Sequence, residues 1–169
     1  MAQLPHVLTD LNAFLREESW AGVCNALTLP KIAWKMADQT LSGAAGDIER
    51  SLGKLEKLES EFTLSKYSAE IADMVGSPSS REQIITIRGA VDVGDSYIGV
   101  VVRLGGFWKS MDLPEWKPSS ETEIKLSVAC EHFELEVDGR EVVYVDKMTN
   151  VIRMAGTDRN KELRNLLGQ

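Results

Sequence analysis

The chain is poor in the residues that most often carry chemistry or cross-link small proteins. Its 169 residues include two cysteines, Cys24 and Cys130, and two histidines, His6 and His132. Two cysteines cannot complete a four-thiolate metal site, and in a reducing cytosol they are expected to be small buried apolar residues rather than a disulfide. With two histidines, acid-base catalysis at neutral pH has few candidates.

Long apolar runs and an excess of basic charge are also missing. No apolar stretch approaches the roughly 18 residues of a membrane-spanning helix, and the N-terminus lacks the basic start and apolar core of a secretory signal. The formal net charge is −7, which argues against a surface that grips a phosphate backbone, because such binding requires clustered Lys and Arg. We therefore expect one soluble domain, residues 1–169, that is made and kept in the cytoplasm.

No catalytic or nucleotide-binding motif compensates for these absences. The segment GDIERSLGKL has six residues between Gly46 and Gly53, where a phosphate loop requires four, and Leu55 stands where a magnesium-binding Ser or Thr is needed. Neither Gly-x-Ser-x-Gly nor His-Glu-x-x-His is present. The sequence therefore predicts no enzyme, no catalytic residue, no cofactor and no metal.

What the sequence does contain is mainly the pattern of β-strands. The segments QIITIRGAV (83–91) and YIGVVVRLGGFW (97–108) are rich in β-branched and aromatic residues, and IAWKM (32–36) alternates large apolar residues with Ala and Lys. The paired glycines Gly105 and Gly106 within the second segment indicate a bulge or a close backbone contact. We expect these segments to be strands with one face inward.

Two helices are expected beside the strands. A short helix over about 66–75 is predicted with Ser65 as its N-cap and Gly76 as its stop, and a C-terminal helix over about 158–167 with Thr157 or Asp158 as its cap and Gly168 as its stop. The segment 48–62 is ambiguous. Its leucines recur at helical spacing, yet residues 57–64 also alternate as in a two-faced strand, so both assignments remain open.

The segment CEHFELEVDGREVVYVD (130–146) predicts a β-hairpin. Asp-Gly between alternating apolar residues favours a type I′ turn. Counting back from the turn places Val137 opposite Arg140, Glu136 opposite Glu141, Leu135 opposite Val142 and Phe133 opposite Tyr144.

The acidic side of this hairpin admits three interpretations. A metal site would have to combine Cys130 and His132 with glutamates, and no further His or Cys lies nearby. A catalytic carboxylate pair needs an apolar pocket, which a polar face does not offer. We therefore expect Glu134, Glu136 and Glu141 to form a solvated or partner-facing side.

The inward side of the strand before this turn changes parity. The apolar residues are first Ile124, Leu126 and Val128, at even positions, and then Phe133, Leu135 and Val137, at odd ones. A change of parity requires a bulge or break between Val128 and Phe133, or a change of packing partner. A strand that extends beyond its own core also indicates a neighbouring subunit.

The four tryptophans are expected to be core or interface anchors rather than a stacking platform for sugars or bases. They are Trp20, Trp34, Trp108 and Trp116. Trp116 lies in the polar loop LPEWKPSS, where a large apolar side chain should be held by some partner.

The order of these pieces resembles that of the major tail tube proteins of contractile-tailed bacteriophages and of the similar R-type bacteriocin tubes. The matching pieces include NAFLREESWAGVCNALTLPKIAWK, LSGAAG, MVG, VVVRLGGFWKSMDLPEWKPSSETEIKLSV, FELEVDGREVVYVD and NVIRMAGTDRNKELRNLLG, and they span nearly the whole chain. The resemblance implies a mainly β fold, an antiparallel sandwich or small barrel with a short flanking helix and a C-terminal helix, assembled as hexameric rings. It also implies that 57–65 is extended and that the charged loop 41–54 reaches the next ring.

The resemblance gives the expected surfaces and partners. Inter-ring stacking is predicted for Leu41, Ser42, Gly43, Ala44, Ala45, Gly46, Asp47 and Ile48. Residues that alternate with core positions are the lumen candidates: Lys35, Gln39, Lys57, Glu59, Glu61, Glu123 and Lys125. The sheath-facing candidates are Glu134, Glu136 and Glu141.

The implied partners are copies of the same chain and the sheath, tape measure, baseplate and tail terminator proteins. DNA is expected to pass through the lumen without specific binding, in a virion tail assembled in the host bacterial cytoplasm. Two rival classes remain open, the tube of a bacteriocin or secretion system and a small-molecule-binding barrel.

Overall fold

The computed structural model describes residues 5–169, and its elements are mainly antiparallel strands. In chain order they are β1 (Val7–Leu15), β2 (Glu18–Ser19), β3 (Cys24–Thr28), β4 (Trp34–Thr40), β5 (Asp47–Leu55), β6 (Glu59–Leu64), α1 (Ala69–Met74), the 3-10 helix η1 (Pro78–Glu82), β7 (Ile84–Asp92), β8 (Tyr97–Asp112), β9 (Ile124–Val137), β10 (Arg140–Asp146), β11 (Val151–Met154), β12 (Thr157–Asp158) and α2 (Lys161–Leu167). The predicted mainly β fold with a C-terminal helix is confirmed.

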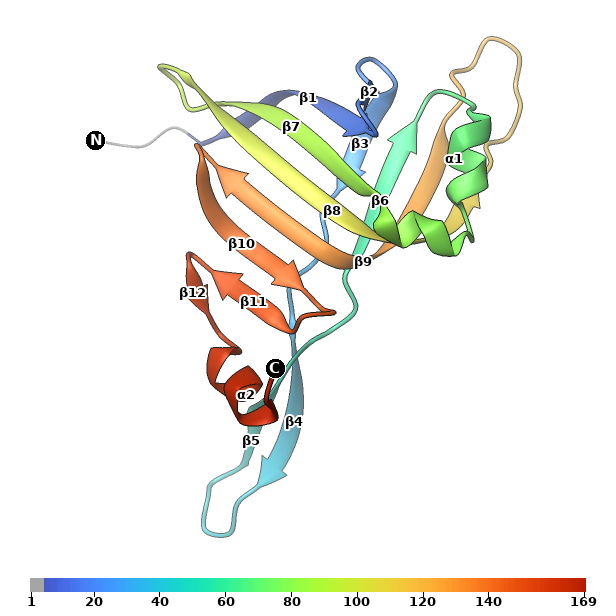
Figure 1. Cartoon of the computed structure of the whole chain (residues 1–169). Coiled ribbons are helices and arrows are strands. Elements are labelled where there is room, and N and C mark those ends of the chain that lie inside the picture. The colour runs from blue at the N-terminus through green and yellow to red at the C-terminus, as the bar shows by residue number, and fades with distance from the viewer. Residues whose placement is uncertain (1–4) are drawn as a thin grey trace.

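One large sheet and one separate hairpin make up the architecture (Figure 1). The sheet runs in the order β12-β11-β10-β9-β8-β7-β1-β2, and β3 and β6 join it through β9. Strand β9 connects its two halves, because β6 pairs with residues 124–129 and β10 with residues 132–137, while β8 runs along both. Strands β4 and β5 pair with each other and project beyond the sheet.

The change of parity within β9 is a β-bulge, as predicted. His132 lies opposite Gly105 and Cys130 lies opposite Gly106, so Glu131 has no direct partner on β8. Even-numbered positions are buried from Ile124 to Cys130, and Phe133 is the next buried residue. The extra residue turns the side chains over while the strand continues, so both halves of β9 face the same core.

The core fills the space on the inner side of this sheet. Its largest fully buried side chains include Trp108, Phe62, Leu58, Leu64 and Leu104. Both cysteines are buried and free, as expected. Burial raises the pKa of the Cys130 thiol to about 11, so the thiol stays protonated at neutral pH.

Both helices begin later than the sequence predicts. Helix α1 has Ser68, not Ser65, as its N-cap, because the Ser65 amide still donates to the Val23 carbonyl at 2.8 Å and continues the sheet. The cap predicted at Thr157 or Asp158 of the C-terminal helix is also wrong. Those residues form β12 against β11, and the N-cap of α2 is Asn160.

The stop signals lie where the sequence places them. Gly168 closes α2 in the left-handed conformation, with φ of 72°.

None of the helices within residues 5–169 is long and apolar enough to cross a membrane.

The ambiguous segment 48–62 is extended, so tertiary pairing overrides its helical spacing. The expected strand over 57–65 is observed as β6. The expected loop over 41–54 is wrong in extent, because residues 47–55 pair with β4 and the turn comprises 41–46. The Thr40 hydroxyl donates to the Asp47 carboxylate at 2.7 Å and closes this hairpin.

The register of the β9–β10 hairpin agrees with the prediction near the turn and departs from it beyond Glu141. Val137 faces Arg140 and Glu136 faces Glu141, as predicted. A bulge at Val142 then shifts the ladder, so the predicted facing of Leu135 with Val142 and of Phe133 with Tyr144 is wrong. Leu135 faces Val143 and Phe133 faces Val145. The Val142 carbonyl instead accepts the Ala155 amide at 2.8 Å.

Candidate assembly surfaces

The β4–β5 hairpin presents apolar side chains that its own chain does not cover. It extends away from the large sheet at one end of the molecule (Figure 1). Its exposed apolar residues are Met36, Leu41, Ile48 and Leu52. Exposed apolar side chains gathered on one projecting element indicate a contact with another molecule.

A bulge marks the point where this hairpin leaves the body. Trp34 faces Leu55 and Met36 faces Ser51, so three residues of β5 lie opposite one residue of β4. The middle residue of the bulge, Gly53, has φ of 68°, a conformation that glycine adopts at low steric cost. Since bulges bend a strand, this bulge sets the direction in which the hairpin points.

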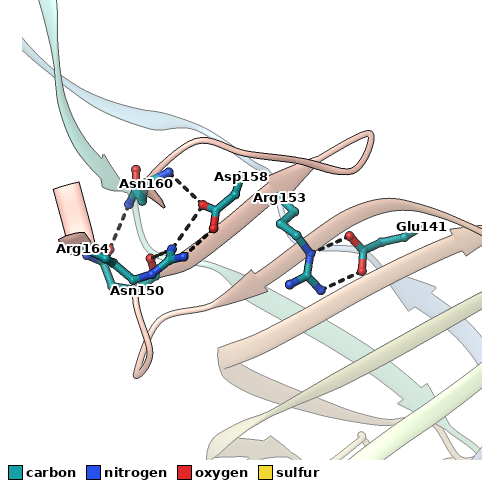
Figure 2. A network of polar contacts seen from close by, with 6 residues as sticks. All are labelled: Glu141, Asn150, Arg153, Asp158, Asn160 and Arg164. Atoms are coloured by element: carbon teal, nitrogen blue, oxygen red, sulfur yellow. Dashed lines mark hydrogen bonds and ion pairs between the residues drawn. The ribbon is translucent and has the colours of Figure 1, made fainter. Parts of the chain in front are cut away.

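A polar cluster ties the hairpin root to the C-terminal segment (Figure 2). The Asn160 side-chain amide donates to the Gly53 carbonyl at 3.1 Å and to Asn150 Oδ1 at 2.9 Å. Arg164 donates to the Asn150 carbonyl at 3.0 Å and pairs with Asp158 at 2.5 Å. The hydrogen bond from Arg164 lowers the pKa of the Asp158 carboxyl.

We expect Asn160→Ala to loosen the hairpin root and to lower the free energy of unfolding by about 1–3 kcal/mol. Asn160 is 3% exposed, and its removal deprives the partly buried Gly53 carbonyl and Asn150 Oδ1 of this donor. Chemical denaturation and amide hydrogen exchange across 52–55 measure the two effects. Asn165→Ala, at an exposed asparagine of the same helix, is the control, and equal stability of the two variants would contradict the prediction.

The acidic residues of the β9–β10 hairpin are partly buried and paired within the chain. Arg103 lies 3.2 Å from Glu134 and 2.9 Å from Glu136. Arg153 donates two bonds of 2.8 Å to Glu141. The expected solvated or partner-facing side is thus partly exposed and paired with arginines. Its contact with a sheath stays a prediction.

Sequence reasoning missed both arginines. Arg103 lies on β8, and its cross-strand partner is Glu134, 31 positions further along the chain. Arg153 lies on β11 and also covers the Tyr144 ring, with its Cζ 3.8 Å from the ring centroid. The Arg153 hydrogen bond lowers the pKa of Glu141, so this carboxyl stays charged at neutral pH.

The structure brings some lumen candidates together and separates others. Glu59 and Glu61 lie on the outer side of β6, where Lys109 approaches Glu59 to 2.6 Å and Lys125 approaches Glu61 to 3.9 Å. Opposite charges thus alternate across neighbouring strands. The hydrogen bond from Lys109 lowers the pKa of the exposed Glu59 carboxyl. Sequence reasoning missed Lys109, because a bulge in β8 places it beside Glu59.

The remaining lumen candidates lie elsewhere. Lys35 and Gln39 are exposed on the projecting strand β4, and Lys57 and Glu123 are exposed just outside β6 and β9. The position of the seven candidates in a lumen stays a prediction.

The fold and these surfaces define a structural subunit that assembles with other proteins. The chain belongs to the family described as phage tail tube protein FII, whose model matches residues 5–168. It is 29% identical, over 98% of its own length and 98% of the relative's, to the tail tube protein of Escherichia phage P2. The predicted resemblance is confirmed, and the chain is a tail tube protein, a structural component of a virion.

The fold is also found in solved structures. The chain matches a subunit of the PVC sheath-tube complex, an extracellular contractile injection system in its extended state, with a TM-score of 0.59 and 13% identity over 78% of this chain and 91% of that one. It matches a subunit of the anti-feeding prophage cap with a TM-score of 0.61 and 10% identity over 80% and 93% of the two chains. At these identities the likeness shows the fold.

Proposed function

We propose that the chain forms hexameric rings that stack into the inner tube of a contractile phage tail, through which the genome is ejected into the host. The observation that carries this proposal is the projecting, apolar β4–β5 hairpin. Within a ring, each subunit contacts its neighbour through two different surfaces, and the rotation between subunits closes the ring. Stacking of rings needs a second pair of surfaces, whose contact repeats along the tube axis without closing. A projecting hairpin suits the second kind of contact.

The stacking contact is proposed for the hairpin tip, Leu41 to Ile48. The two apolar residues that flank the turn are half-exposed, and the turn between them is made of small residues that fit against another backbone. Next to these two residues, the Thr40 hydroxyl already donates a hydrogen bond to the Asp47 carboxylate. Docking of this tip on the next ring would therefore bury apolar surface at a small loss of polar hydration.

The ring contact is proposed to use open strand edges. Strand β2 pairs with residues 14–15 of β1, and the Ala13 carbonyl accepts the Trp20 amide at 2.7 Å. Among the described residues, the outer edge of β1 before Ala13 has no paired strand. Val7 and Leu8 on this edge are exposed. A neighbour that adds a strand there would satisfy the free amides and carbonyls and cover these apolar side chains.

The lumen is proposed to pass DNA without holding it. Glu59 and Glu61 on β6 pair with Lys109 of β8 and Lys125 of β9, so a row of copies would present paired charges. The net charge of −7 leaves no excess of cations to bind phosphates.

Outside the tube, the proposed partners are the sheath, with Glu134, Glu136 and Glu141 as contact candidates, and the tape measure, baseplate and tail terminator proteins. Assembly would take place in the host bacterial cytoplasm. The sheath and terminator assignments are supported by the sources of the similar folds, a sheath-tube complex and a tube-terminating cap.

A second candidate function is the tube of a phage-tail-like bacteriocin or injection system. It is favoured by the fold shared with an extracellular contractile injection system. Nuclease-protected DNA in purified particles separates the two, because a phage particle contains a genome.

We expect Leu41→Asp with Ile48→Asp to leave rings intact and to abolish tubes. Two buried, unpaired carboxylates at a stacking contact would disfavour it strongly. Negative-stain microscopy and sedimentation of the purified protein measure rings and tubes. The apolar control, Leu41→Met with Ile48→Val, should still form tubes, and long tubes from the aspartate variant would refute stacking through this tip.

A further inference from the structure

Trp116 is a large apolar side chain that the fold holds in place but does not cover. It lies in the loop between β8 and β9 and is 81% exposed. Its indole Nε1 donates to the Tyr67 hydroxyl at 2.7 Å, and the two rings meet edge to face at 6.5 Å. An indole that is both exposed and fixed in direction is preorganised for a partner, since little rotamer freedom is lost on binding.

The position of this loop relates it to the stacking hairpin. Figure 1 places the β8–β9 loop beyond α1, at one end of the molecule, and the β4–β5 hairpin at the opposite end. A contact that propagates from ring to ring joins two different surfaces at opposite ends of the subunit. The loop is therefore suited to meet the hairpin end of another copy.

The hairpin end offers two apolar hollows at its root. One, of about 390 Å³, lies between β5 and α2. Its apolar lining consists of Leu55, Met148, Ile152, Leu163 and Leu167. The apolar side chains that line the other are Trp34, Met36 and Met154. Helix α2 buries none of its residues, so its leucines remain open to a neighbour.

The charges of the two ends are complementary. The loop 112–123 carries four carboxylates and one lysine. The basic side chains that line the two hollows are Lys54, Lys147 and Arg159. Among the described residues lining them, the one carboxylate side chain is Asp146, which accepts the amides of Met148 and Thr149 at 2.9 and 3.2 Å. The loop at one end is therefore acidic, and the hollows at the other end are apolar and basic.

We propose that the loop 112–123 of one copy docks against the hairpin root of a second copy, with Trp116 as its apolar anchor. The inference rests on the proposed stacking of rings and names the surface that receives each ring. The hairpin reaches past the contact while its root accepts the loop. Leu113, also exposed, belongs to the same loop.

Tube yield from purified protein tests this docking. Trp116→Ala should form rings and lower the mass of sedimented tubes at least about tenfold, as expected for loss of an interface anchor. Glu115→Lys with Glu121→Lys should lower it similarly, as should Lys54→Glu with Arg159→Glu. The four changes together should restore tubes, because both surfaces are then reversed.

Controls distinguish failure of this docking from failure of the proposed tube function. Tyr97→Ala removes another exposed aromatic, at the start of β8, and should leave tube yield unchanged. Wild-type yield from Trp116→Ala, equal loss from Tyr97→Ala, loss of rings as well as tubes, or no rescue by the combined reversal would each overturn the docking. Failure of the wild-type chain to form any tube would instead count against the proposed function.

Discussion

Gly106→Ala is expected to lower the free energy of unfolding by about 3 kcal/mol or more, or to prevent folding. Gly106 lies on β8 where the β9 bulge begins, opposite Cys130. A Cβ at this position would lie 2.0 Å from the Ala129 carbonyl oxygen and 2.9 Å from the Cys130 Cα. Both contacts are with backbone, so relief requires the two central strands to move apart.

Gly99→Ala is the matched control for this variant. Gly99 lies on the same strand, and a Cβ there has no heavy atom within 4 Å. Alanine at Gly99 should change stability by less than about 0.5 kcal/mol. Urea denaturation of the unassembled subunit measures both variants, and similar midpoints for the two would show that the close approach at Gly106 is not required.

Trp108→Ala is expected to lower the free energy of unfolding by about 3–5 kcal/mol. Trp108 is 1% exposed and is the largest of the fully buried side chains. Its removal leaves a cavity in the hydrophobic core that the surrounding side chains can fill only in part.

Trp108→Phe separates packing from hydrogen bonding at this position. The Trp108 indole N–H is buried and has no acceptor among the described residues. Phenylalanine keeps most of the apolar contact and removes that unsatisfied donor, so it should be markedly less harmful than alanine. Trp116→Ala, at an exposed position, should be nearly neutral for the stability of the subunit. A phenylalanine variant as unstable as the alanine variant would show that the indole shape, and not apolar volume, is required.

These two stability predictions bear on assembly as well. Strands β8 and β9 join the half of the sheet that carries β6 to the half that carries β10. The charged outer face of β6 and the arginine-paired hairpin therefore keep their relative position only while these two strands remain packed. A variant at Gly106 or Trp108 should lose rings together with stability, whereas a variant at Trp116 should lose tubes alone.

The sequence by itself determined the features that depend on neighbouring residues. Strand alternation located the β9 bulge between Val128 and Phe133, and turn chemistry located the Asp138-Gly139 turn and the Gly168 stop. Period-two alternation, positive φ and helix ends are local properties, so a short stretch of chain contains all the information that they need.

The tertiary structure alone decided the features that depend on distant partners. The segment 48–62 is extended because β4 and β9 pair with it, against its helical spacing. Arg103 and Arg153 neutralise glutamates from other strands, and Asn160 binds Gly53 across more than a hundred residues. Local patterns in a single sequence do not reveal these pairings, because cross-strand register and long-range hydrogen bonds form only when distant segments come together in the folded sheet.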